Sequence, residues 1–189
     1  MDHFARDVGG SHRRCRVNQA EQVDWSDSGH AFRLEQWIDL DAIDTSLGHT
    51  VRGRLSVSIT FRNPWECHIA SRRRTAGITV VPARGSVAAF GVPALDAAFT
   101  VRTSDARVLA SVVTGEVAAW LAALPEVDLD IGARRGVFGQ PSAGGRGQLV
   151  VGAEWTQGTG PEPRGWWGLA RASLEALRRN GICEPAVTP

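Results

Sequence analysis

The sequence predicts an α+β protein with a mainly antiparallel sheet of five to six strands and two amphipathic helices packed on one face. Three observations predict this fold. One segment alternates apolar and polar residues, two other segments carry apolar residues at helical spacing, and the predicted strands outnumber the helices. Two helices that lie far apart in the sequence can both be covered by one face of a single sheet.

The alternating segment covers residues 51–62. Val51, Leu55 and Ile59 belong to its apolar set, and arginine, serine and threonine fill the positions between. Period two places the large apolar side chains on one face of a strand and the polar ones on the other. A sheet with one wet face favours antiparallel pairing.

Further strands are expected from short apolar runs between turn residues. They cover residues 77–81, residues 86–90, a strand through Phe99 and Val101, and a pair at residues 127–131 and 148–155. The glycine-rich segment 132–147 is expected to be a long loop between that pair, and residues 41–47 could form one turn of helix.

The first predicted helix covers residues 106–124. Its apolar stripe consists of Leu109, Val113, Val117, Trp120 and Leu124. Thr103 or Ser104 is expected to cap its first turn, with Asp105 favoured by the helix dipole. A second cap at Thr114-Gly115-Glu116 would divide it into two pieces, and Pro125 ends it.

The last predicted helix covers residues 164–180. Trp166, Ala170, Leu174 and Leu177 are expected to point inward, and Asn180-Gly181 forms a C-terminal cap.

The chain of 189 residues is expected to form one domain. We predict a polar, loosely ordered N-terminal arm at residues 1–30, a single α+β domain at residues 31–182, and a loose tail at residues 183–189.

Residues 98–105, read Ala-Phe-Thr-Val-Arg-Thr-Ser-Asp, precede the apolar helix and the segment Val-Asp-Leu-Asp-Ile-Gly at 127–132. This arrangement resembles uncharacterised bacterial domains of unknown function. In those domains a Phe-x-Val-Arg-x-x-Asp strand end leads into a helix, and paired strands and a last helix follow. The resemblance covers residues 48–180 and implies a fold but no activity.

Composition excludes several chemistries. All 21 basic residues are arginines, and there is neither lysine nor tyrosine. A lysine Schiff base, a P-loop lysine and a tyrosine acid or nucleophile are therefore impossible in this chain. Three widely spaced cysteines, a polar start and no long apolar run favour a soluble protein in the cytoplasm, without a disulfide framework or a membrane partner.

No motif predicts a catalytic residue, a metal ligand or a cofactor. Cys67-His68 and His12-x-x-Cys15 supply too few converging ligands for zinc. Gly144-Gly-Arg-Gly147 lacks the ending of a P-loop and reads as a hairpin tip. A site assembled in space from Cys67, His68, His49 and acidic residues stays open as an alternative.

Two groups of arginines could contact an anion or a nucleic acid. Arg52, Arg54 and Arg62 lie on the wet face of the long strand, and Arg72, Arg73 and Arg74 are consecutive. The formal net charge of +1 disfavours nucleic-acid binding, because 20 acidic residues offset the basic ones.

Tryptophans supply the main candidate for a partner surface. Trp155, Trp166 and Trp167 lie on either side of a predicted loop, and adjacent helical residues cannot both face the core. We therefore predict a non-catalytic protein-interaction or regulatory module, with a protein partner or self-association. The alternative is a small enzyme or small-molecule-binding domain with a pocket between sheet and helices.

Overall fold

The computed structural model describes residues 1–14, 20–44, 48–72, 85–133, 145–156, 160 and 162–184, with only the backbone described at 39–44, 48–49, 133 and 156. The strands are β1 (Ser11–Arg14), β2 (Glu21–Asp27), β3 (His30–Asp44), β4 (Gly48–Thr60), β5 (Cys67–Ser71), β6 (Ser86–Ala88), β7 (Phe99–Thr103), β8 (Asp128–Ala133) and β9 (Arg146–Thr156). The helices are α1 (Asp2–Asp7), α2 (Pro93–Ala98), α3 (Ala106–Val112), α4 (Gly115–Ala123) and α5 (Pro163–Arg179).

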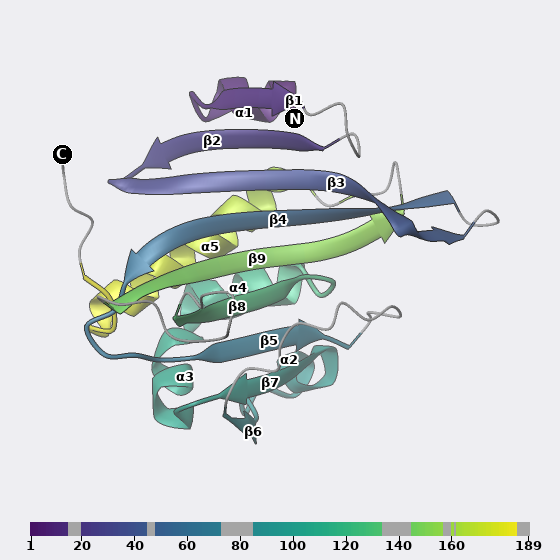
Figure 1. The fold of residues 1–189 in the computed structure, drawn as a ribbon. Helices are drawn as coiled ribbons and strands as arrows, with labels where there is room; N and C mark the ends of the chain where they lie inside the picture. Colours follow the sequence, from purple (N-terminus) through teal and green to yellow (C-terminus); the bar gives the residue numbers. More distant parts are fainter. Residues whose placement is uncertain are drawn as a thin grey trace.

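The described strands form one nine-stranded sheet in the order β1-β2-β3-β4-β9-β8-β5-β7-β6. Every pair of neighbours is antiparallel. Figure 1 shows α4 and α5 together behind this sheet. The predicted α+β class and antiparallel sheet are confirmed, but the described chain contains more strands and helices than the prediction allowed.

The alternating segment forms β4, as predicted. Val51, Leu55, Val57 and Ile59 are buried, whereas Arg54 and Ser58 between them are exposed. The strand lies in the interior of the sheet because β3 pairs with one of its edges and β9 with the other. The middle of the sheet therefore has one apolar face and one polar face.

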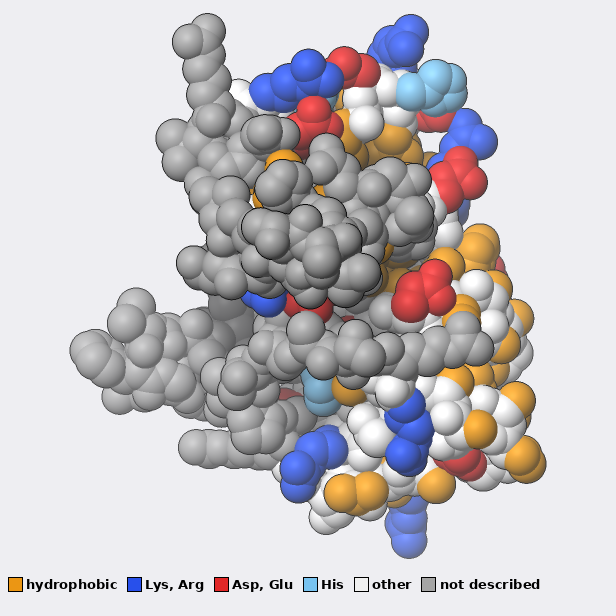
Figure 2. All heavy atoms as spheres, turned by 90° about the vertical axis from the view of Figure 1, so that its right-hand side faces the viewer, with side chains coloured by type: hydrophobic (Ala, Val, Ile, Leu, Met, Phe, Trp, Pro, Cys, Tyr) orange, Lys and Arg blue, Asp and Glu red, His pale blue; other side chains and the backbone are white. Residues whose placement is uncertain are grey.

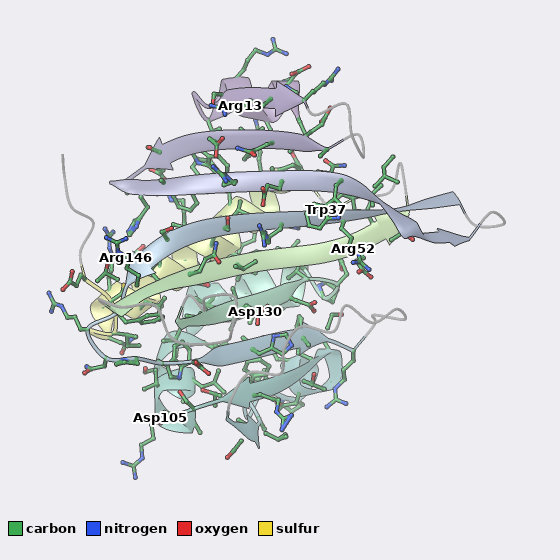
Figure 3. All side chains as sticks on the ribbon, viewed as in Figure 1. Arg13, Trp37, Arg52, Asp105, Asp130 and Arg146 are labelled. Carbon is green, nitrogen blue, oxygen red and sulfur yellow. The ribbon has the colours of Figure 1, made fainter. Side chains whose placement is uncertain are left out.

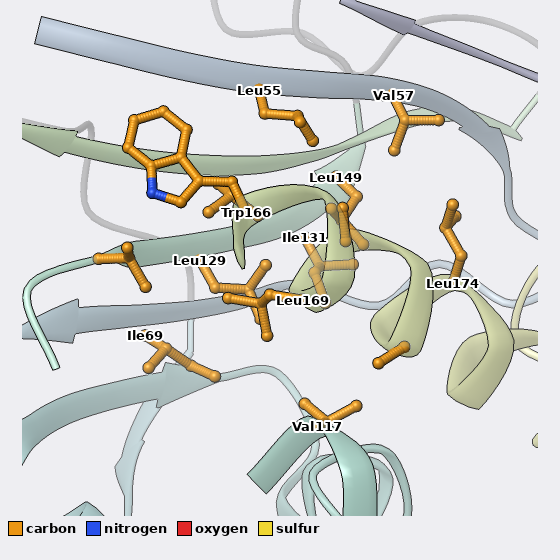
Figure 4. Packing of buried hydrophobic residues seen from close by; sticks show 14 of the residues in the cluster. Leu55, Val57, Ile69, Val117, Leu129, Ile131, Leu149, Trp166, Leu169 and Leu174 are labelled. Carbon is orange, nitrogen blue, oxygen red and sulfur yellow. The ribbon is translucent and has the colours of Figure 1, made fainter. Parts of the chain in front are cut away.

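The hydrophobic core lies between the apolar face of the sheet and the helices α4 and α5 (Figure 4). The buried sheet residues seen there include Leu55, Val57, Ile69, Leu129, Ile131 and Leu149, and they face Trp166, Leu169 and Leu174 of α5 and Val117 of α4. The predicted inward residues of the last helix are all buried, and Asn180 is its C-cap, followed by Gly181 with φ 66°.

The N-terminal segment differs from the loosely ordered arm expected at residues 1–30. It forms α1, β1 and β2, and both strands join the sheet. The Phe4 ring meets Trp25 edge-on at 5.3 Å, and Trp25 stacks on Phe32 at 5.3 Å. The sequence pattern missed this because three aromatic residues from separate elements provide the packing, while local composition stays polar.

Pairing with distant strands also overrides local signals elsewhere. Residues 41–44 extend β3 instead of forming a helical turn, because Asp44 pairs with Gly48 across the ladder. Strand β5 was not predicted, yet it is paired with β7 and β8. Helix α2 was also missed, and the strand predicted at 77–81 lies outside the described residues.

The helix predicted at residues 106–124 consists of two pieces, the alternative raised by the second cap. Helix α3 ends at Val112, α4 begins at Gly115 after Thr114 as N-cap, and the two axes are bent by 84°. Within the described chain, no single helix is both long enough and apolar enough to span a membrane. The bent pair α3 and α4 reaches that length and apolar composition only when the two helices are counted together.

The C-terminal end of the described chain is attached to the sheet. Cys183 forms an antiparallel bridge with Phe61, and the Glu184 amide donates to the Thr60 carbonyl at 2.8 Å. Residues 183 and 184 therefore do not belong to the loose tail predicted at residues 183–189. Residues 185–189 lie outside the described chain.

Candidate functional site

The face of the sheet opposite α4 and α5 is the candidate functional surface, and we call it the polar face. One row across it places Arg13, Gln22, Glu35 and Arg54 side by side on β1 to β4. A second row contains Asp24, Arg33, Ser56, Val150, Asp130, His68 and Arg102. Figure 3 views this face, with Arg13, Trp37, Arg52 and Asp130 among its labelled residues. The period-two alternation of nearly every strand produces it.

Cross-strand ion pairs organise the polar face. Arg33 Nε lies 2.8 Å from Asp24 Oδ1, and Arg54 Nη2 lies 2.6 Å from Glu35 Oε2. Arg52 Nε lies 2.8 Å from Glu154 Oε1, which joins β4 to β9. Since each pair links neighbouring strands, it holds a guanidinium and a carboxylate in fixed positions rather than adding much stability.

Asp24 shows the electrostatic result of this arrangement. Burial opposes ionisation of its carboxyl group, but hydrogen bonds from Arg33 and Gln22 outweigh burial and hold its pKa below the ordinary value. The carboxylate is therefore charged at neutral pH and pairs with a charged arginine.

Three of the six arginines predicted to contact an anion or a nucleic acid have partners within the described chain. Arg52 and Arg54 are paired with carboxylates of the adjacent strands. Arg72 Nε donates to the Phe99 carbonyl at 2.9 Å, and Arg62 is exposed. Arg73 and Arg74 lie outside the described residues. Figure 2 shows basic and acidic side chains interspersed on one side of the molecule rather than a single basic patch.

A groove of about 600 Å³ opens at the β1–β4 end of the polar face. Its described lining residues are Arg13, Arg14, Ala20, Glu21, Gln22, Glu35, Gln36, Trp37 and Arg54. Trp37 is half-buried and lies directly opposite Arg52 in the β3–β4 register. The groove therefore presents one aromatic ring among guanidinium and carboxylate groups. Sequence reasoning missed Trp37 as a site residue. Its position two residues after Glu35 could have indicated that its side chain lies on the polar face of β3.

The predicted partner-binding tryptophans lie on the helix-covered side of the sheet. Trp166 is only 2% exposed, so it cannot anchor a partner. Its ring meets Trp155 edge-on at 5.6 Å, and both rings lie over Gly53, where a Cβ atom would come within 2.5 Å of Trp155 and 2.6 Å of Trp166. A glycine is required at this position of β4 because the two indoles occupy the space of its side chain.

Trp167 and Trp155 are both half-buried. Trp167 contacts Trp25 edge-on at 6.4 Å, and the Arg171 guanidinium lies 5.4 Å above its ring. A Cβ atom at Gly160 would lie 2.3 Å from Nε1 of Trp155, so Gly160 packs against that indole. Of the three predicted residues, Trp166 is therefore a core residue, whereas Trp155 and Trp167 keep partly exposed rings.

The candidate catalytic residues Cys67 and His68 point to opposite faces of β5. Cys67 is 2% exposed and faces the core, and burial, followed by the charge of Asp130, raises the pKa of its thiol to about 12. A thiol in that state is a poor nucleophile and metal ligand. His68 lies on the polar face, where its Nδ1 is 2.5 Å from Asp130 Oδ1.

These orientations exclude a shared Cys67–His68 site. The side chain of His49 is not described, and the described residues contain no group of three or more histidine, cysteine or acidic side chains placed to hold a metal. The space between sheet and α5 beside Trp155 and Trp166 measures about 20 Å³, which is room for one water rather than a ligand.

Comparison with known proteins gives one likeness in fold. No family model matches the chain, and no curated protein matches it. The crystal structure of the mycobacterial trehalose monomycolate transport factor A, TtfA, is similar with a TM-score of 0.52 and 8% sequence identity. The alignment covers 94% of this chain and 92% of that chain. At this identity the likeness concerns the fold alone.

Proposed function

We propose that the chain is a non-catalytic binding module whose protein partner docks on the polar face, at the groove beside Trp37. The observation that carries this proposal is the composition of the groove. It combines a half-buried indole with Arg54 and Glu35, which a 2.6 Å ion pair holds in place. Tryptophan and arginine are the residues most enriched at the energetic centres of protein interfaces.

The rigidity of the groove supports recognition of a protein. Glu35 and Arg54 lie on the two long paired strands β3 and β4, so their backbone positions are fixed before binding. Preorganised groups lose less conformational entropy when a partner binds. Charges of both signs favour a partner surface that also carries both signs, and they disfavour a uniformly charged polymer.

The absence of reactive geometry among the described residues supports a non-catalytic role. The thiol of Cys67 is buried. The hydrogen bond described for the His68 ring is to the Asp130 carboxylate and not to a serine, threonine or cysteine nucleophile. The fold of TtfA, a transport factor by name, is compatible with an accessory protein that acts through another protein. A cytoplasmic location is part of the same proposal.

The test compares partner capture by variants of the full chain. Proteins that co-purify with the wild-type chain are identified, and the strongest is purified for titration. Trp37→Ala and Arg54→Gln are each expected to weaken its affinity at least tenfold, about 1.4 kcal/mol or more. The control is Arg107→Gln, an exposed arginine on α3, which should leave the affinity unchanged.

Two results would overturn the proposal. One is equal affinity of the wild type, Trp37→Ala and Arg54→Gln for the partner. The other is a monomeric wild-type chain that retains no protein under the capture conditions. Circular dichroism of each variant verifies that a loss of affinity does not come from unfolding.

A further inference from the structure

Helix α5 is followed by the dipeptide Asn180-Gly181, a pair of residues with a covalent chemistry of its own. The chain contains three asparagines, and Asn180 is the one that precedes a glycine. Because a glycine has no Cβ atom, its backbone nitrogen can approach Cγ of the preceding asparagine with little steric hindrance. A bond between these two atoms closes a five-membered succinimide ring, the intermediate of spontaneous deamidation.

The backbone at this site forms a Schellman motif. The Gly181 amide donates to the Arg178 carbonyl at 2.9 Å, and the Ile182 amide donates to the Leu177 carbonyl at 2.9 Å. Gly181 has φ 66°, and a Cβ atom at this position would meet no described atom within 4 Å. The backbone nitrogen that closes the ring is therefore held in the helix cap, while the space beside Gly181 is open.

The Asn180 side chain connects two helices. Its Nδ2 atom donates to the Ala176 carbonyl of α5 at 2.8 Å and to the Ser111 carbonyl of α3 at 3.1 Å. These two bonds use both hydrogens of the carboxamide. In Figure 1 the yellow C-terminal end of α5 lies beside α3. Since Asn180 is exposed, water reaches the site that joins the two helices.

We propose that Asn180 is a site of spontaneous deamidation, and that its conversion releases the C-terminal end of α5 from α3. The Gly181 nitrogen forms a bond to Cγ of Asn180 as the Cγ–Nδ2 bond breaks. Nδ2 leaves as ammonia, taking the hydrogen of the Gly181 amide. Water then opens the succinimide ring at one carbonyl to give aspartate, or at the other to give isoaspartate. This chemistry is independent of the function proposed for the polar face.

The cap controls how fast the ring closes. The Gly181 amide is bonded to the Arg178 carbonyl, and the Asn180 carboxamide is bonded to two further carbonyls, so these bonds open before the reaction. The end of a helix opens locally at a lower free energy than the whole protein unfolds. We therefore expect the native chain to deamidate at a measurable rate that is lower than the rate of the unfolded chain.

Either product removes the connection to α3. A carboxylate has no hydrogen to donate, and on aspartate it would face the Ser111 and Ala176 carbonyl oxygens at the negative end of the α5 dipole. Isoaspartate also inserts the side-chain methylene into the main chain, which displaces the Gly181 and Ile182 amides from their acceptors. Loss of ammonia makes the change irreversible, so the conversion acts in one direction only.

The first experiment incubates the full chain near pH 8, in buffer and in urea, and follows deamidation by peptide mapping with mass spectrometry. Asn180 is expected to convert under both conditions, at least tenfold faster in urea. Asn63 is an internal control, because it is exposed but precedes Pro64, whose nitrogen carries no hydrogen to lose. In urea, Gly181→Ala should slow the conversion at least tenfold, because the added methyl group hinders ring closure.

The second experiment tests the release of α5. Ion-exchange chromatography separates the deamidated chain, which carries one more negative charge. Backbone amides of residues 177–184 are expected to exchange hydrogen at least tenfold faster in this form than in the unmodified chain. Asn180→Asp should lower the melting temperature, whereas Asn63→Asp, the same change at an exposed asparagine, should leave it unchanged.

Three results would overturn the proposal. The first is an Asn180 that stays intact in the native chain while the chain in urea converts completely. The second is an equal rate of conversion in buffer and in urea, since the cap would then offer no protection. The third is unchanged hydrogen exchange of residues 177–184 in the deamidated chain, which would show that α5 remains attached to α3.

Discussion

At the start of α3 the Asp105 carboxylate accepts hydrogen bonds from the backbone amides of Arg107 at 2.8 Å and Val108 at 3.4 Å. Sequence reasoning expected Thr103 or Ser104 to provide this cap. Thr103 Oγ1 instead accepts from the Trp65 indole at 3.0 Å, and Ser104 Oγ accepts from the Glu66 amide at 3.0 Å. Three adjacent capping residues look alike in sequence, and contacts with a distant segment decide which of them caps.

Replacement of Asp105 tests this assignment. We expect Asp105→Ala to lower the free energy of unfolding by about 1 kcal/mol, because two amides lose their acceptor. Asp105→Asn keeps a side-chain oxygen and should cost a few tenths of a kcal/mol. Urea denaturation measures both values, and a loss as large for Asn as for Ala would contradict the capping role.

Among the elements, those with a strong local pattern were predictable. Strand β4 has period two along its length, and α5 has an apolar stripe with a C-terminal cap, so both were found. Strands β1, β2 and β5 are only four to seven residues long, so any alternation in them is brief, and neighbouring strands supply their hydrogen bonds. The groove beside Trp37 was missed for the same reason, since cross-strand register brings its residues together.

The close contact of α4 with α5 allows a second test. A Cβ atom at Gly168 would lie 2.4 Å from Cζ2 of Trp120, so Gly168→Ala overpacks this interface. We expect it to cost about 1–3 kcal/mol, despite the better helix propensity of alanine.

A double-mutant cycle isolates this clash. In a Trp120→Ala background, Gly168→Ala should become neutral or stabilising by up to about 1 kcal/mol, because the ring is gone. Thermal or urea unfolding of the four proteins provides the coupling energy. Additive effects of the two changes would show that the ring and the glycine do not compete for space.

On the scale of the whole molecule, the fold class follows from local patterns, but the extent of the sheet does not. The sequence pattern placed residues 1–30 outside the domain because they are polar on average. The structure places Phe4, Val23 and Trp25 in the common core, and Asp7 Oδ2 lies 2.5 Å from Arg164 Nη2 of α5. The assignment of residues 31–182 as one domain stays a prediction.

Phe4 tests whether the N-terminal segment contributes to global stability. We expect Phe4→Ala to lower the free energy of unfolding by about 3 kcal/mol, because its buried ring packs on Trp25. His3→Ala is the matched control, since the His3 side chain is 80% exposed. Comparable small losses in both variants, measured by urea denaturation, would indicate a segment that does not share the core.

The pairing of β4 with β9 has a consequence for how the protein is made. Thr60 lies opposite Arg146 and Thr50 opposite Thr156, so the middle of the sheet joins segments from the first and last thirds of the chain. The meander β1–β4 can assemble as soon as it emerges during synthesis, but one edge of β4 then stays open until β9 arrives. During that interval the nascent chain exposes a long unpaired strand edge that can pair with other chains. We expect binding of a chaperone to suppress aggregation most effectively at this stage of synthesis.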